Sequence, residues 1–242
     1  MDSLYSAAKT AASAYPPSPE STLLSAQQSK SEPDIAARVR NHMRWIRVPG
    51  IHLDAQLEHF PQELRDKVLG SIDAGRGPYV FGMPGRGKTH LAIAILRHLM
   101  TNIYCRTGRV RSLKYSHVND MLLDIKGAFS RGTGETEEDM IDRYSCPDGL
   151  ILDDFGVAKK SDWVVQTIDT IIDRRYRDGK ICVITSNLSL DELAAKLDDR
   201  IASRITEMCM VVHMVGQDRR AEKAVARKKE LSEPHPEEAA HA

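Results

Sequence analysis

A glycine-rich motif limits the possible folds of this 242-residue chain more than any other part of its sequence. The motif reads Gly82-Met83-Pro84-Gly85-Arg86-Gly87-Lys88-Thr89 and satisfies the pattern G-x-x-x-x-G-K-[ST]. A short apolar run, 78–81, precedes it, and a strongly helical segment, 89–100, follows it. Glycines let the backbone curl so that its N–H groups point inward at an anion, and the helix adds the positive end of its dipole. The motif therefore predicts a strand, a phosphate-binding loop and a helix.

The last two residues of the motif indicate which phosphate compound is bound. The ammonium group of Lys88 is expected to reach the β- and γ-phosphates, and the hydroxyl of Thr89 is expected to ligate magnesium. ATP and Mg2+ are therefore the expected cofactors. A glycine turn that binds nothing is the alternative, and the strand and helix on either side argue against it.

Two acids follow a short apolar run. Asp153 and Asp154 come directly after residues 150–152, which are Leu-Ile-Leu. Such a run is typical of a parallel strand buried on both faces, and ligands bind at the carboxyl ends of such strands. Asp153 is expected to act on the magnesium ion by accepting from its bound water, and Asp154 is expected to polarise the attacking water. The alternative is a pair of aspartates that forms a turn and caps the next helix.

A second strand ends in the same way. The apolar run 181–184 is followed by Thr185, Ser186 and Asn187. Polar groups at this place could contact a γ-phosphate, and Asn187 is the best candidate for a sensor of it. An Asx-type turn before the next helix is the alternative.

Strands and helices alternate along most of the chain. Further strands are expected at 110–116 and 210–215. Helices are expected at 34–48, 61–73, 118–129 and 163–176, with Tyr176 facing inward. One helix or a pair of helices is expected from Leu190 to about Glu207, and a polar loop is expected at 131–138. This alternation predicts an α/β fold with a central parallel sheet covered on both sides.

Composition indicates the cellular compartment of the protein and the kinds of partner that it binds. The 34 basic and 34 acidic side chains cancel, so overall charge gives no case for nucleic-acid binding. The four cysteines have no C-x-x-C spacing and are expected to be reduced and mostly buried. No secretory signal is evident, and no apolar stretch approaches the roughly 20 residues that a membrane span needs. A cytoplasmic protein without a membrane partner is expected.

Several motifs together resemble a known family. They are Gly-Met-Pro-Gly-Arg-Gly-Lys-Thr-His-Leu-Ala at 82–92, Leu-Ile-Leu-Asp-Asp-Phe-Gly at 150–156, Ile-Thr-Ser-Asn-Leu at 184–188 and Ser-Arg-Ile-Thr-Glu-Met at 203–208. Over residues 51–220 the chain resembles an AAA+ ATPase of the DnaC/DnaI helicase-loader group, to which the transposition helper IstB is also similar. The resemblance implies a three-layer P-loop AAA+ fold with a short N-terminal helical extension and without a full C-terminal lid domain.

The resemblance also assigns residues. The expected nucleotide-binding residues are Gly82, Pro84, Gly85, Arg86, Gly87, Lys88, Thr89, His90 and Arg220. Arg204 is expected to act as an arginine finger on ATP held by a neighbouring subunit, with Arg200 as second choice. The alternative for Arg204 is a surface helix arginine paired with Asp198, Asp199 or Glu207. Arg220 is expected to be a sensor in its own subunit, with a plain basic surface as the alternative.

The ends of the chain depart from the family. Residues 1–33 are rich in Ser, Ala, Pro and Gln and are expected to be disordered. Residues 34–60 are expected to hold an amphipathic helix and a linker that binds a partner or packs on the ATPase domain at 61–216. Residues 217–242 are expected to form a basic, then acidic, tail. The N-terminal segment has no cysteine, so no zinc module is expected.

The second acid, Asp154, is a glutamate in many relatives, which leaves the rate of turnover open.

The leading functional hypothesis is an ATP-dependent loader of a hexameric replicative DNA helicase. It would assemble into a ring or spiral around single-stranded DNA when ATP is bound, with Lys114, Lys126 and Arg131 as possible DNA contacts. The alternatives are an IstB-like ATPase helper of a transposase, a P-loop small-molecule kinase, and an adaptor that binds ATP without hydrolysing it.

Overall fold

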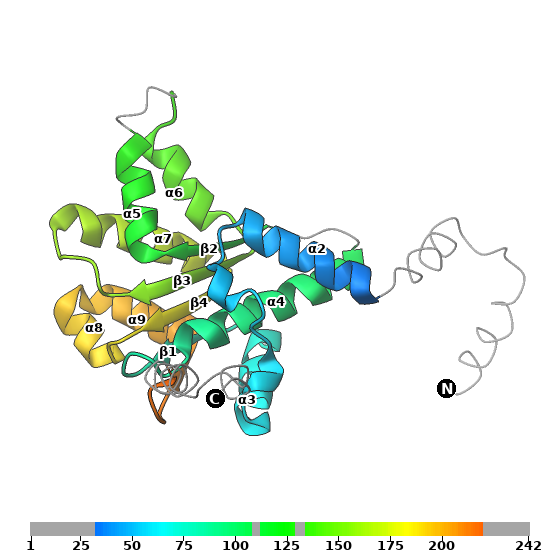
Figure 1. The fold of residues 1–242 in the computed structure, drawn as a ribbon. Helices are drawn as coiled ribbons and strands as arrows, with labels where there is room; N and C mark the ends of the chain where they lie inside the picture. The colour runs from blue at the N-terminus through cyan, green and yellow to red at the C-terminus, as the bar shows by residue number, and fades with distance from the viewer. Residues whose placement is uncertain (1–31, 108–111, 129–133, 220–242) are drawn as a thin grey trace, which may run out of the picture.

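The structure is a computed structural model that describes residues 32–107, 112–128 and 134–219 (Figure 1). Its described strands form one sheet in the order β2-β3-β4-β1-β5, and every neighbouring pair is parallel. The strands are β1 (Gly77–Phe81), β2 (Leu113–His117), β3 (Gly149–Phe155), β4 (Ile181–Ser186) and β5 (Cys209–His213). The predicted α/β fold with a central parallel sheet is confirmed.

Helices cover both faces of this sheet. They are α2 (Glu32–Trp45), α3 (Gln62–Asp73), α4 (Lys88–Thr107), α5 (Val118–Gly127), α6 (Glu137–Ser145), α7 (Asp162–Arg177), α8 (Leu190–Lys196) and α9 (Asp199–Met208), with short 3-10 turns η2 (Gly50–His52) and η3 (Leu57–His59). Helices α2, α3 and α4 lie on one side, and α5 to α9 lie on the other (Figure 1). The result is the expected three-layer arrangement.

Successive residues of the central strands feed two separate cores. In β3, Leu150 and Leu152 join the core shared with α5, α6 and α7, whereas Ile151 joins the core shared with α3 and α4. Side chains of a strand point alternately to opposite faces, so a wholly apolar run is needed where both faces are covered. This requirement explains the short apolar runs in the sequence.

Helix α6 was not predicted, because the sequence suggested a loop over 131–138 and nothing beyond it. Thr136 caps this helix: its hydroxyl accepts from the N–H of Asp139, and the Asp139 carboxylate accepts from the N–H of Thr136. Met140 and Tyr144 are buried in the core that this helix shares with α5 and α7. A capping box followed by apolar residues at helical spacing was therefore present in the sequence.

Two other local predictions were wrong. Helix α2 ends at Trp45, earlier than expected, because Arg47 adopts a left-handed conformation (φ 63°) and the N–H of Val48 donates to the carbonyl of Met43. Tyr176 was expected to face inward, but it is 39% exposed and its hydroxyl donates to Glu207.

Helix α2 packs on its own domain through one face. Val39 and Met43 are fully buried in the core that contains the apolar face of α4. Trp45, at the end of the helix, is 76% exposed. One face of α2 is thus occupied, and the binding of a partner by its outer face stays a prediction.

Two further expectations concern cysteines and membranes. Cys182 and Cys209 are buried, but Cys105 and Cys146 are exposed, so the expectation of mostly buried thiols holds for two of the four. Within the described residues, none of the helices combines the length and the apolar character required to span a bilayer. The predictions for residues 1–31 and for 220–242 lie outside the described residues.

Candidate functional site

The phosphate-binding loop connects the carboxyl end of β1 with the first turn of α4. Gly82, Gly85 and Gly87 have φ values of 145°, 77° and 89°, in the region that side chains disfavour. These glycines are therefore required by the shape of the loop. The strand, loop and helix predicted from the motif are all present.

Lys88 places a buried cation inside this loop. It is 8% exposed, and its ammonium group donates to the carbonyls of Gly82 (2.8 Å) and Met83 (3.0 Å) and to Oδ1 of Asn187 (2.7 Å). Phosphate oxygens are strong acceptors for an ammonium group, and their negative charge strengthens such hydrogen bonds. The loop and its lysine thus fit a bound polyphosphate.

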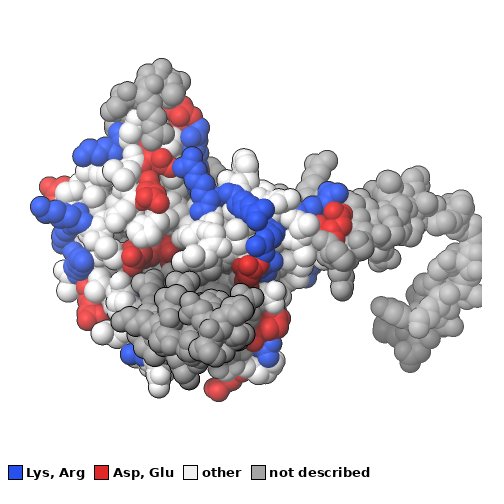
Figure 2. Space-filling view, in the orientation of Figure 1, with Lys and Arg blue, Asp and Glu red and all other residues white. Residues whose placement is uncertain are grey.

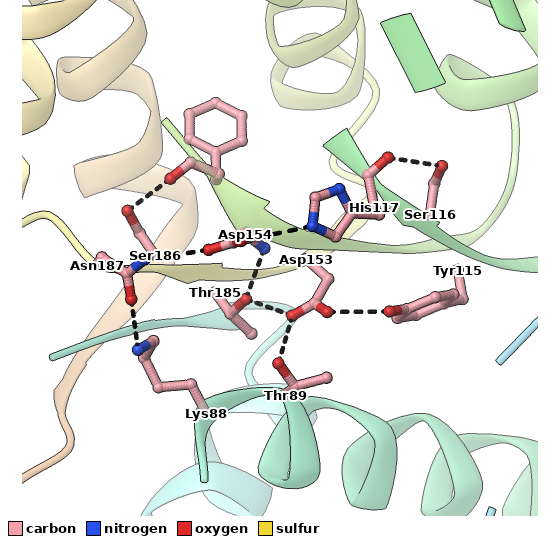
Figure 3. Close-up of polar contacts among 11 residues, drawn as sticks. Lys88, Thr89, Tyr115, Ser116, His117, Asp153, Asp154, Thr185, Ser186 and Asn187 are labelled. Atoms are coloured by element: carbon pink, nitrogen blue, oxygen red, sulfur yellow. Dashed lines mark hydrogen bonds and ion pairs between the residues drawn. The ribbon is translucent and has the colours of Figure 1, made fainter. Parts of the chain in front are cut away.

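Asp153 lies at the centre of a cluster of hydroxyl groups (Figure 3). Its Oδ1 accepts from the hydroxyls of Thr89 (2.9 Å) and Thr185 (2.6 Å), and its Oδ2 accepts from the phenol of Tyr115 (2.9 Å). Burial, and next the charge of Asp153, raise the pKa of Tyr115 well above its usual value, so Tyr115 stays a donor. The carboxylate is thereby fixed in orientation.

This cluster fits a magnesium ion. Mg2+ prefers hard oxygen ligands and keeps several water molecules, so that one or two protein ligands suffice beside phosphate oxygens. The hydroxyl of Thr89 and the carboxylate of Asp153 lie next to each other, and Thr89 directly follows Lys88 (Figure 3). The sequence predicted both residues, whereas Tyr115 and Thr185 were not assigned this supporting role.

Asp154 is held in a strained conformation at the end of β3. The register of β3 against β4 shifts between Leu152 and Phe155, and Asp154 has a left-handed φ of 60°. Its N–H donates to the hydroxyl of Thr185 (2.9 Å), and its Oδ1 accepts from Nδ2 of Asn187 (3.2 Å). Such strain in a non-glycine residue persists only where the surroundings enforce it, and it occurs preferentially at functional sites.

Asn187 connects the two halves of the site. One end of its amide accepts from Lys88 and the other end donates to Asp154 (Figure 3). The side-chain turn after β4 is instead made by Ser186, whose hydroxyl accepts from the N–H of Leu188. The alternative of an Asx turn is therefore wrong.

The alternative in which Asp153 and Asp154 form a turn and cap the next helix is also wrong, because Ser161 caps α7.

His117 is a site residue that the sequence reasoning missed. It ends β2 opposite Asp153, and its Nε2 lies 3.4 Å from Oδ2 of Asp154. Both side chains are about one-third exposed, at 33% and 37%. The available signal was a polar residue at the carboxyl end of a strand next to β3, which is where the acids themselves were found.

The first turn of α4 is tied to the segment before β1. Nε2 of His90 lies 2.8 Å from Nδ1 of His59, and Nδ1 of His90 lies 3.4 Å from Nδ1 of His52. The His90 side chain therefore contacts other histidines, and its contact with a nucleotide stays a prediction. Arg86 lines a cavity of about 660 Å³ beside the loop, together with Phe60 and Arg219.

The arginines predicted for a neighbouring subunit lie on α9. Arg204 is paired with Asp169 (2.7 Å) and Asp173 (3.0 Å) of α7, not with the acids that the sequence suggested. Arg200 is paired with Asp198. Action in trans stays a prediction, and Arg220 lies outside the described residues.

Of the three suggested DNA contacts, two are described. Lys114 is half-buried on β2 with its ammonium group 4.3 Å from the centre of the Tyr144 ring, and burial lowers its pKa. Lys126 is exposed on α5. Arg131 lies outside the described residues. Basic side chains form a band across this face (Figure 2), and Arg47, Lys114 and Arg143 line a groove of about 840 Å³.

Comparison with known proteins decides the family. The family model described as "IstB-like ATP binding protein" matches residues 69–226, which is more than half of the chain. This chain belongs to the IstB-like ATP binding proteins. The phosphate loop, Asp153, Asp154 and Asn187 all lie inside the matched region of this family.

Individual relatives of this IstB-like protein include helicase loaders. Over 135 residues it is 30% identical to the replicative helicase loader DnaC of Escherichia coli strain K12, covering 55% of this chain and 52% of that protein. The chain thus spans about half the length of the curated relatives it matches.

Solved structures agree on the fold. The crystal structure of the DnaC helicase loader gives a TM-score of 0.58 at 25% identity, covering 69% of this chain and 100% of that one. The AMPPCP-bound structure of DnaA from Aquifex aeolicus gives a TM-score of 0.56 at 20% identity, covering 76% of this chain and 58% of that one. This second likeness concerns the fold alone.

Proposed function

We propose that this protein is an ATP-dependent loader of a hexameric replicative DNA helicase onto single-stranded DNA, acting in DNA replication. The observation that carries the ATP-dependent part is the convergence of Lys88, Thr89 and Asp153 at one edge of the sheet. The similarity to DnaC, whose name states its role as a replicative helicase loader, supports the client.

The residues of the site divide the work of ATP hydrolysis. Lys88 and the loop amides would hold the phosphates, and Thr89 and Asp153 would hold a magnesium ion. When bound, that ion supplies positive charge that offsets the charge of the phosphates. Asp154 would orient and polarise the attacking water, with its carboxylate fixed by Asn187 and His117. Asn187 also contacts Lys88, so it is suited to sense the γ-phosphate.

Arg204 would complete the site of a neighbouring subunit in a ring or spiral. A guanidinium group stabilises charge on the transferred phosphoryl oxygens because it is planar and permanently charged. Arg204 now pairs with Asp169 and Asp173, so action in trans requires it to exchange these carboxylates for phosphate. This requirement favours slow hydrolysis in the isolated subunit and stimulation by assembly, by the client or by single-stranded DNA.

A transposase helper is the second candidate. The description of the matched family, IstB-like ATP binding protein, favours it. The motif Ser203-Arg204-Ile205-Thr206 and the similarity to DnaC favour the loader. An adaptor that binds ATP without hydrolysing it is a further candidate, because the side chain of Asp154 is one methylene shorter than that of glutamate.

A capture experiment separates these candidates. The tagged full chain is used in lysate of its native host with ATP, without nucleotide, and as the Lys88→Ala variant, and the retained proteins are identified. We expect ATP-dependent capture of a replicative helicase by the wild type and none by Lys88→Ala. Capture of a transposase instead would favour the second candidate. Purified protein that binds ATP but never hydrolyses it, even with helicase and single-stranded DNA, would favour the adaptor.

A further inference from the structure

The chain that follows β5 contacts the phosphate loop. We call residues 214–219 the C-terminal strap. The N–H of Met214 donates to the carbonyl of Phe81 (2.7 Å), and the N–H of Arg219 donates to the carbonyl of Gly85 (3.1 Å). The strap is thus bonded to the loop near both of its ends, and the end of the described chain lies beside the loop in Figure 1.

Each glycine of the loop faces the strap. A Cβ atom at Gly82 would overlap the main-chain carbonyl of Met214, and one at Gly87 would lie 3.5 Å from the guanidinium of Arg219. A Cβ atom at Gly85 would overlap the carboxylate of Asp218, whose farther oxygen would be 2.6 Å away. Gly82 and Gly85 are therefore needed for the close approach of the strap as well as for their φ values, whereas a Cβ atom at Gly87 would make an ordinary contact.

Asp218 brings a negative charge against a loop that is built for anions. The neighbouring loop residues contribute helix-terminal N–H groups and the ammonium of Lys88, all of which favour negative charge. A carboxylate touching Gly85 shares that positive region with the phosphates of a nucleotide. Like charges repel, and the repulsion grows with the charge of the ligand.

We propose that the charge of the Asp218 carboxylate weakens the binding of nucleoside triphosphates by the phosphate loop. The main-chain bonds of the strap hold the loop in shape, while the charge of Asp218 opposes the arrival of phosphate. The effect is a lower affinity for ATP, and by reciprocity bound ATP loosens the contact between the strap and Gly85. The inference rests on the proposed binding of nucleotide by this loop.

The test compares nucleotide affinities of full-length variants that differ in one charge. Asp218→Asn keeps the shape of the side chain and removes its charge. Asp178→Asn, at the end of α7, removes the same charge far along the chain from the loop. Dissociation constants for ATP and ADP are measured by isothermal titration calorimetry with magnesium, at about 50 mM and about 500 mM salt, because salt screens exposed charges.

We expect Asp218→Asn to bind ATP about five- to tenfold more tightly than the wild type at low salt, with a smaller gain for ADP and a smaller gain at high salt. Asp218→Glu, which keeps the charge, and Asp178→Asn should resemble the wild type. Unchanged or weaker ATP binding by Asp218→Asn would overturn the inference and make the strap contact purely structural. A gain that is equal for ATP and ADP and independent of salt would do the same. If the wild type binds no nucleotide, the proposed function itself fails.

Discussion

The hydroxyl of Thr185 supports both acids of the site, and its removal makes a sharp prediction. Thr185 is 1% exposed, and its hydroxyl donates to Oδ1 of Asp153 (2.6 Å) and accepts from the N–H of Asp154 (2.9 Å). In Thr185→Val the shape is kept, but a hydrogen bond to a charged group is lost, at about 1.5–3 kcal/mol. The N–H of Asp154 also loses its acceptor, at about 1–3 kcal/mol. Because the extra methyl group returns less than about 1 kcal/mol, the net loss is about 3 kcal/mol.

Urea unfolding followed by circular dichroism measures this loss. We expect Thr185→Val to lower the midpoint without changing the slope, because the surface exposed on unfolding stays the same. Thr185→Ser is the matched control: it keeps the hydroxyl, loses one methyl group, and should cost about 1 kcal/mol. Thr185→Val should also need more magnesium for ATP binding, because Asp153 loses one of the hydrogen bonds that orient its carboxylate. A stability within about 0.5 kcal/mol of the wild type would refute the assigned role of this hydroxyl.

Three further predictions concern single side chains. Arg204→Ala should bind ATP within about twofold of the wild type, but its stimulated rate of hydrolysis should fall about a thousandfold. Mixing Arg204→Ala with Asp153→Asn should restore activity, and a mixture without activity would leave action in trans unsupported. His117→Ala should lower kcat about tenfold with little change in KM, and His117→Asn should recover part of the lost kcat, because a hydrogen-bonding side chain can still hold Asp154. A kcat of His117→Ala equal to that of the wild type in steady-state assays would show that His117 has no role in the site. Arg175 is fully buried and donates to four carbonyls, so Arg175→Met should cost at least about 3 kcal/mol in thermal or urea unfolding, and a smaller loss would show that these carbonyls find other donors.

Local sequence patterns predicted the parts of the site that one segment forms alone. The phosphate loop follows from glycines and a lysine within eight residues, and the acids follow from an apolar strand that ends in Asp153 and Asp154. Neighbouring parallel strands end at the same edge of a sheet, so Asn187 could be placed there as well. The capping box that starts α6 was equally local and could have been found.

Contacts between distant segments were beyond such patterns. Arg204 pairs with Asp169 and Asp173, and not with the acids near it in the sequence, because of the way α9 packs on α7. The position of Asp218 against Gly85 depends on where the chain goes after β5. His117 gained its role only because β2 lies next to β3, a neighbour relation that the order of strands along the chain does not fix.

We propose that the loop amides, Lys88 and Asp153 together hold ATP with magnesium. Calorimetric titration of the full chain with ATP, with and without magnesium, tests it most directly when the same titration is run on Lys88→Ala. We expect saturable binding by the wild type that magnesium strengthens, and no detectable binding by the variant. ATP binding of normal strength by Lys88→Ala, or none by the wild type, would show that this loop is not the nucleotide site.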